Sequence, residues 1–134
     1  MGEGALRMKC LYLDTHVLIW LYEGALQRFS SRALHLLETT DLLVSPMAVL
    51  EMRFLFEIDR INVDAPSILT YLQNNIDVQL CQIPFPRVMI QSLEIDWTRD
   101  PFDRLIVAQA IAGGGSLLTK DRTILNHSIA ALWD

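Results

Sequence analysis

The chain has 134 residues, of which 51% are hydrophobic and 20% are charged, and its net charge is −5. This length and composition fit one compact globular domain and exclude a disordered chain. No apolar run approaches the ~20 residues of a membrane span, and the negative charge argues against a general electrostatic binder of nucleic acid.

The N-terminal stretch MGEGALRMKC lacks the apolar core of a signal peptide. We therefore expect a cytoplasmic protein that does not enter a membrane, in which Cys10 and Cys81 are reduced core residues. Because Met8 directly precedes the first apolar strand, we expect residues 1–7 to be a flexible extension. Residues 8–134 are then expected to form a single domain.

The rest of the sequence alternates short apolar strands with helices that begin at Ser, Asp or Pro. In chain order, the expected strands span residues 10–14, 41–45, 76–83, 116–119 and, at an edge, 131–133. The expected helices span residues 17–22, 30–38, 46–58, 64–73, 86–93 and 101–112. Strands that are mostly apolar throughout predict an α/β fold with a parallel sheet of four to five short strands, covered by helices on both faces.

The segment WTRDPFDRLIVAQA contains the start of the longest apolar helix. Asp100 is expected to be its N-cap, with Pro101 at the first helical position. Asp103 falls in the first turn, where a carboxylate meets the positive end of the helix dipole. However, Asp103 also heads an apolar stripe that continues through Val107 and Ala110, and a carboxylate on a buried face needs a partner. Capping and a role in a site both remain open for Asp103.

Four acids are expected at the edge of the sheet where the strands end. Asp14 follows the first strand, Asp121 follows the fourth, and Asp103 opens the helix that leads down to the fourth strand. Glu51 lies in the helix that leaves the second strand, within a stripe that is otherwise apolar. Ligands of open α/β sheets bind at this edge.

Clustered carboxylates repel one another unless protons or divalent cations neutralise them. Oxygen ligands alone favour Mg²⁺ or Mn²⁺, and such ions activate water for phosphodiester hydrolysis. Taken singly, Asp14 and Asp121 fit helix caps or loop acids equally well, whereas Glu51 on an apolar stripe is harder to explain structurally. The coincidence of the four acids at one edge favours a metal site.

The segments LDTHVLIWL, SPMAVLEM, RDPFDRLIVAQA and LLTKD together resemble the PIN-domain ribonucleases, and among them the VapC-like toxins of type II toxin–antitoxin pairs. The resemblance covers nearly the whole chain from Met8 onward. It implies a three-layer α/β/α fold and a Mg²⁺- or Mn²⁺-dependent endoribonuclease that is usually a homodimer. It also implies a cognate antitoxin whose tail covers the site.

The resemblance matches Asp14, Glu51, Asp103 and Asp121 to the four acids of the family, which serve as catalytic metal ligands. It matches Thr119, in LLTKD, to a hydroxyl residue that orients water or phosphate. Further from the metal, we expect Asp100 to act chiefly as a cap, with a supporting role beside the site. Arg104, Lys120 and Arg122 are candidate contacts to RNA phosphates, although they equally suit an ordinary solvated surface. His16 is expected to serve helix initiation or packing.

The function expected from the sequence is therefore hydrolysis of RNA by the toxin of a toxin–antitoxin pair. Two alternatives keep the fold: an RNA-processing nuclease outside such a pair, and a catalytically silent module that only binds RNA or a protein. A phosphatase with Asp14 as an aspartyl-phosphate nucleophile is disfavoured, because His16 stands where that loop needs a second acid.

Overall fold

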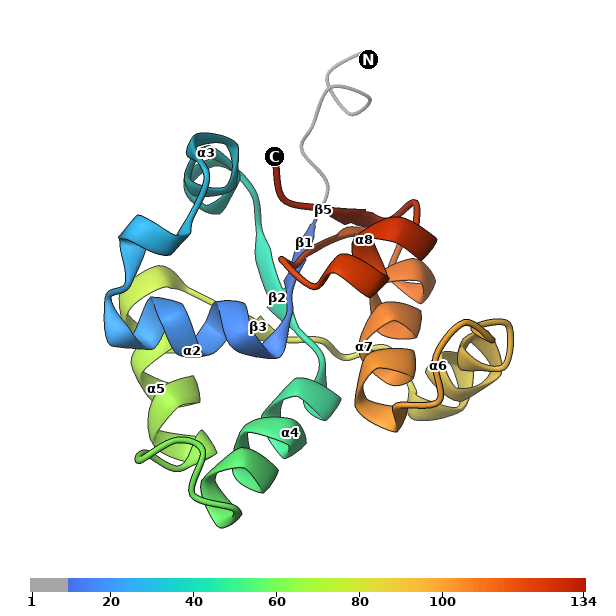
Figure 1. Cartoon of the computed structure of the whole chain (residues 1–134), viewed down its shortest axis with the longest axis horizontal. Coiled ribbons are helices and arrows are strands. Elements are labelled where there is room, and N and C mark those ends of the chain that lie inside the picture. The colour runs from blue at the N-terminus through green and yellow to red at the C-terminus, as the bar shows by residue number, and fades with distance from the viewer. Residues whose placement is uncertain (1–9) are drawn as a thin grey trace.

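A computed structural model describes residues 10–134, and the extension expected at residues 1–7 lies outside the described part. Five parallel strands form one sheet in the order β3–β2–β1–β4–β5, with β1 at the centre (Figure 1). The strands are β1 (Leu11–Leu13), β2 (Leu42–Val44), β3 (Gln79–Leu80), β4 (Ser116–Leu118) and β5 (Ala131–Leu132). The expected parallel sheet is confirmed. That residues 8–134 form a single domain stays a prediction.

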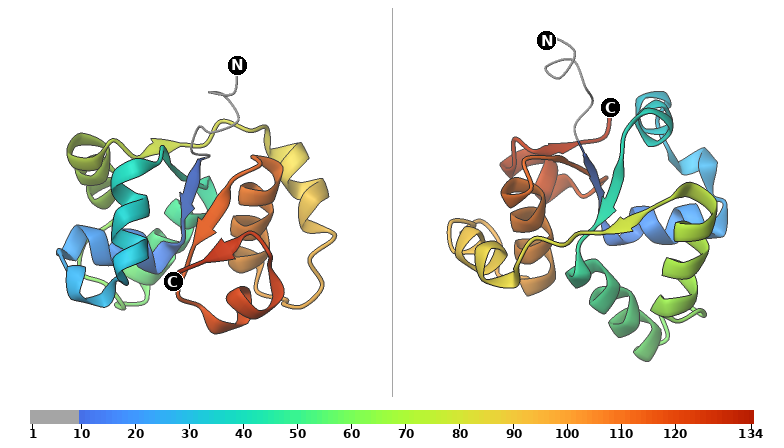
Figure 2. Two further views of the ribbon diagram at one scale, coloured as in Figure 1. Left: turned by 90° about the horizontal axis from the view of Figure 1, so that it is seen from above. Right: turned by 180° about the vertical axis from the view of Figure 1, so that it is seen from behind.

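Helices cover both faces of the sheet, which confirms the three-layer α/β/α architecture. The helices that connect β1, β2 and β3 lie on one side of the sheet, and those that follow β3 lie on the other (Figure 2). The first set is α2 (Thr15–Glu23), η1 (Leu26–Arg28), α3 (Ser31–Thr39), α4 (Pro46–Glu57) and α5 (Ala65–Ile76). The second set is α6 (Phe85–Ser92), α7 (Pro101–Ala112) and α8 (Arg122–His127). The connections from β1 to β2 and from β2 to β3 move along the sheet in one direction, whereas those from β3 to β4 and from β4 to β5 move in the other. Because such connections are right-handed, the two sets of helices lie on opposite faces of the sheet.

The central strand β1 is buried along its whole length, which confirms the expectation drawn from its apolar sequence. Residue by residue, it pairs with β2 on one side and with β4 on the other. Because all the strands are parallel, their carboxyl ends meet at one edge. The loops that leave β1, β2 and β4 there carry Asp14, Ser45 and Thr119.

The structure differs from the predicted elements mainly around β3. The strand expected over residues 76–83 is only two residues long. Helix α5 continues through Ile76 and ends at Asp77, which adopts the left-handed conformation with a φ of 56°. Helix α8 and the short 3₁₀ helix η1 were not expected from the sequence.

Two further expectations concern the cysteines and the membrane. Cys81 is buried and Cys10 is half-buried, and both are free thiols, as expected. Among residues 10–134, no helix combines the length and the apolar character that crossing a membrane requires.

Candidate active site

The four predicted acids line one small pocket at the carboxyl edge of the sheet. The pocket has a volume of about 140 Å³, and its lining includes Asp14, Glu51, Asp103 and Asp121. Asp14 caps α2, Asp121 caps α8, and Asp103 lies in the first turn of α7, whereas Glu51 lies in the middle of α4. Four elements that are distant in the sequence therefore each supply one carboxylate.

Asp14 is buried, and both of its carboxylate oxygens accept hydrogen bonds. Oδ1 accepts from the backbone N–H of Thr15 at 2.8 Å, and Oδ2 accepts from the hydroxyl of Thr119 at 2.8 Å. Thr119 is completely buried, and its hydroxyl also accepts the backbone N–H of Asp121 at 3.0 Å. The Thr119 hydroxyl therefore joins Asp14 to the loop that carries Asp121.

Glu51 is held by a residue that the sequence analysis did not single out. The hydroxyl of Thr15 donates a hydrogen bond to Oε1 of Glu51, and Thr15 also lines the pocket. Burial raises the pKa of Glu51; the Thr15 hydrogen bond opposes that shift, and Asp14, Asp100 and Asp121 add to it. The position of Thr15 in the first turn of α2 gave no sign of this contact, because its partner lies 36 residues away.

Asp103 has the most perturbed carboxyl group of the pocket. Burial, followed by repulsion from Asp100, Asp14, Asp121 and Glu51, raises its pKa from 3.8 to about 7. Asp103 itself makes no capping contact through its side chain among the described residues, whereas Oδ1 of Asp100 accepts the backbone N–H groups of Phe102 and Asp103 at 2.8 and 3.1 Å. Asp100 thus caps the helix, and Asp103 faces the pocket.

His16 lines the acidic pocket, whereas the sequence led us to expect only helix initiation or packing. Its Nε2 accepts the backbone N–H of Lys120 at 2.9 Å, and its Nδ1 lies 3.7 Å from Oδ2 of Asp14. The ring also packs edge-on against Trp20, with 4.9 Å between the ring centroids. Burial lowers the pKa of His16; Asp14 and Asp121 oppose the shift, while Lys120 adds to it. Because the Nε2 atom accepts this hydrogen bond, the neutral ring has its proton on Nδ1.

The predicted basic contacts do not line the acidic pocket. Lys120 and Arg122 line a neighbouring pocket on the other side of the loop that carries Asp121. Arg104 reaches towards α6, where its guanidinium donates to the carbonyl of Ser92 at 3.4 Å. Their contact with RNA stays a prediction.

The side-chain atoms of the pocket that could ligate a metal are oxygens and one imidazole, a set that suits a hard divalent cation. Burial first, and then repulsion from the neighbouring acids, raises the pKa values of Glu51 and Asp103, and a cation between the carboxylates would relieve that repulsion. Within residues 10–134, no three acid, histidine or cysteine side chains are already arranged around an ion position.

Comparison with known proteins identifies the class. The PIN domain family model matches residues 11–128, and the chain belongs to this family. Ribonuclease VapC22 of Mycobacterium tuberculosis is 35% identical over 123 residues, which cover 90% of this chain and 93% of that protein. The fold is also similar to a chain in the crystal structure of VapBC2 from Rickettsia felis bound to a DNA fragment from their promoter. That match has a TM-score of 0.65 and 13% identity, and it covers 93% of this chain and 99% of the other.

Proposed function

We propose that this PIN domain is a Mg²⁺- or Mn²⁺-dependent endoribonuclease and the toxin of a type II toxin–antitoxin pair in the cytoplasm. The observation that carries the proposal is the convergence of Asp14, Glu51, Asp103 and Asp121 on one pocket. The 35% identity to Ribonuclease VapC22 over nearly the whole chain supports RNA as the substrate. The acids that the sequence analysis selected as catalytic metal ligands are the same four.

The residues of the pocket have separable roles in this proposal. Asp14 and Glu51 are oriented by the hydroxyls of Thr119 and Thr15, so their oxygens are fixed before substrate arrives. Burial and the neighbouring acids raise the pKa of Asp103 to about 7, and a bound divalent cation would hold this carboxylate in its ionised form. A bound Mg²⁺ or Mn²⁺ would stabilise charge on the phosphate oxygens and make a water more acidic.

A cognate antitoxin is proposed to cover the surface of α4 next to the pocket. Leu50, Phe54 and Ile58 are 53%, 43% and 44% exposed on this helix, and Leu55 lines the pocket itself. A protein that covers these apolar side chains would thereby reach the acids. The name of the VapBC2 structure, to which this fold is similar, supports a partner protein for this chain.

A homodimer is proposed through α6, which packs against α7. This helix and the turn after it expose four large apolar side chains, Phe85, Met89, Ile90 and Leu93. Exposed apolar patches of this kind mark protein interfaces in soluble proteins. None of the α6 side chains lines the acidic pocket, so a second copy there would leave the site accessible.

The decisive experiment measures cleavage of a panel of single-stranded and structured RNAs with Mg²⁺, with Mn²⁺ and with EDTA. We compare the wild-type protein with Glu51→Gln and with Glu57→Gln, which removes one carboxylate from the exposed face of the same helix. We expect metal-dependent cleavage by the wild type and by Glu57→Gln, and a loss of about 100-fold or more in Glu51→Gln. Cleavage that persists in EDTA, or that survives in Glu51→Gln, contradicts the proposed mechanism.

A further inference from the structure

A second pocket lies beside the acidic one, and its lining has three basic side chains and one acidic residue, Asp134. Its volume is about 480 Å³, and its lining includes Arg32, Lys120, Arg122 and Trp133. Lys120 and Arg122 flank Asp121, which lines the acidic pocket. The two pockets are therefore separated only by the short loop at residues 120–122. We refer to Arg32, Lys120 and Arg122 together as the basic pocket.

Aromatic rings, rather than carboxylates, hold Lys120 of this pocket and the nearby Arg28. The guanidinium of Arg28 lies over the ring of Trp20, 5.0 Å from its centroid. The ammonium of Lys120 lies 6.0 Å from the centroid of Trp20 and 5.7 Å from that of Trp133. A cation–π contact positions a cation without cancelling its charge. Arg28 and Lys120 are therefore fixed in place while remaining available to an anion.

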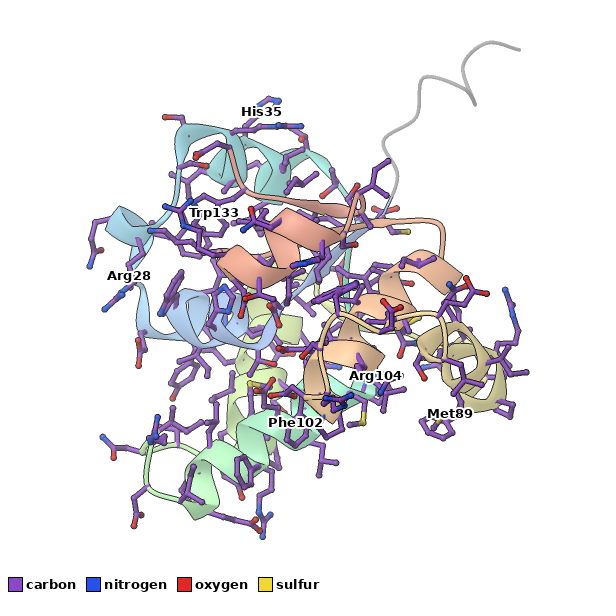
Figure 3. The ribbon with its side chains drawn as sticks, turned by 45° about the vertical axis from the view of Figure 1, so that its right-hand side comes forward. Arg28, His35, Met89, Phe102, Arg104 and Trp133 are labelled. Atoms are coloured by element: carbon purple, nitrogen blue, oxygen red, sulfur yellow. The ribbon has the colours of Figure 1, made fainter. Side chains whose placement is uncertain are left out.

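The other cations of the described chain lie elsewhere or are already paired. Among the described residues, Arg53 forms salt bridges with Glu57 and Asp64, and the guanidinium of Arg32 donates a hydrogen bond to the backbone oxygen of Asp134. Arg104 contacts Ser92 beside α6. In Figure 3, Arg28 and Trp133 lie in the upper left of the view, whereas Phe102 and Arg104 lie lower and further right. Lys120 and Arg122, beside the acidic pocket, thus have no salt-bridge partner among the described residues.

We propose that the basic pocket binds the phosphates of the single-stranded RNA that adjoin the cleaved bond, and this inference rests on the function proposed above. An RNA strand whose scissile phosphate lies at Asp121 reaches Lys120 and Arg122 with its neighbouring phosphates, because these residues flank Asp121 in the chain. Cations already cover the Trp20 and Trp133 rings, so bases do not stack there. The basic pocket therefore contacts the phosphate backbone of the RNA and does not recognise its base sequence.

The test measures binding of a short fluorescein-labelled oligouridylate by anisotropy, in EDTA so that no cleavage occurs, across a range of salt concentrations. The double variant Lys120→Gln with Arg122→Gln is compared with Arg53→Gln with Arg60→Gln, which removes the same charge from exposed positions at the far end of α4. For single strands, each phosphate contact contributes about 0.7 to the slope of log affinity against log salt. We expect the slope to fall by about 1.4 in the first double variant and affinity to fall by about tenfold near 0.1 M salt. The control variant should match the wild type.

Equal affinity and equal salt slope in the two double variants overturn the proposal. So does a loss of inhibition by the cognate antitoxin without any loss of RNA binding, because the basic pocket then serves an acidic protein segment. Circular dichroism of both variants excludes misfolding as the cause of weak binding. The outcomes are independent of the proposed nuclease: RNA bound through the basic pocket without metal-dependent cleavage refutes only the nuclease, whereas cleavage with unchanged binding in the variant refutes only the basic pocket.

Discussion

At the scale of single residues, hydroxyl groups arrange the acidic pocket. Thr119 contacts both Asp14 and the backbone of Asp121, and Thr15 contacts Glu51. A threonine hydroxyl can donate one hydrogen bond and accept others at the same time, so Thr119 can satisfy a carboxylate and a backbone N–H together. The oxygen positions of the site therefore depend on two uncharged residues.

Replacing Thr119 by Val tests this dependence, because valine has nearly the same shape but lacks the hydroxyl. Oδ2 of Asp14 and the N–H of Asp121 would then lose their partner, and we expect a loss of about 1–3 kcal/mol in the free energy of unfolding. Cleavage should fall as well, since Asp14 is no longer fixed. Chemical denaturation and the RNA assay measure the two effects. Thr119→Ser, which keeps the hydroxyl, should restore most of both; a valine variant as stable and active as the wild type refutes the role.

The raised pKa of Asp103 leads to a prediction about stability and pH. Its pKa is about 7 in the folded protein, against 3.8 for an ordinary aspartate. The folded state therefore binds this proton more tightly than the unfolded state, so stability is lost as the pH rises from about 4 to above 7. Asn at position 103 carries no charge at any pH. In EDTA, we expect Asp103→Asn to match the wild type near pH 4 and to be more stable at pH 8, on the order of 1–2 kcal/mol after solvent screening.

Thermal unfolding at several pH values measures this difference. Excess Mg²⁺ or Mn²⁺ at pH 8 should stabilise the wild type more than the variant, because only the wild type has the full set of carboxylates. A stability difference that does not depend on pH would show that the charge of Asp103 is not the cause.

At the scale of secondary-structure elements, helix N-caps position three of the four acids at the pocket. Asp14 and Asp121 each follow a strand and cap the next helix, and Asp100 caps the helix whose first turn contains Asp103. A cap fixes the backbone and the side-chain direction at once. Asp14 and Asp121 therefore each cap a helix and line the acidic pocket, so capping does not exclude the predicted role in a site.

Asp100 separates capping from a direct part in catalysis. Asn caps helices as well as Asp does, whereas Ala does not. We expect Asp100→Asn to keep both stability and metal-dependent cleavage, and Asp100→Ala to lose about 0.5–2 kcal/mol of stability. Denaturation curves and cleavage rates of the two variants check this. A large loss of cleavage in Asp100→Asn would instead place this carboxylate among the groups that act on the substrate.

The accuracy of the sequence-based prediction varied with the local signal. Helix α7 was predicted from Pro101 to Ala112, as observed, because an Asp-Pro start and a glycine run mark its ends. The strand at β3 was predicted too long, since an apolar run does not show where α5 ends at Asp77. Helix α8 was missed because it has only six residues and a single buried side chain.

The same limit explains which residues of the site were found. The four acids were selected because each one follows a strand or interrupts an apolar stripe. Thr15 and His16 were not selected, because their partners Glu51 and Lys120 lie 36 and 104 residues away. Their contacts depend on α4 and on the end of β4 lying beside the start of α2, and no local pattern in the sequence encodes that proximity.

At the scale of the whole molecule, the apolar side chains of α6 predict self-association. Ile90 and Leu93 are 66% and 69% exposed. We expect sedimentation to show a dimer for the wild type and a monomer for Ile90→Glu with Leu93→Glu, because two charges at the contact cannot be buried without partners. The monomeric variant should keep its circular dichroism spectrum. A wild-type protein that stays monomeric at high concentration refutes the dimer.

The order of the strands also determines when the site comes into existence. Asp14 and Asp121 are separated by 107 positions (121 − 14), and Thr119 joins them across β1 and β4. A ribosome has therefore made most of the chain before the pocket can close, at roughly 5–20 residues per second. Every nascent chain that stops short of residue 121 lacks the fourth carboxylate, and one that stops short of residue 119 also lacks the threonine that orients the first. If the proposed nuclease is correct, activity begins only after the polypeptide has emerged beyond residue 121.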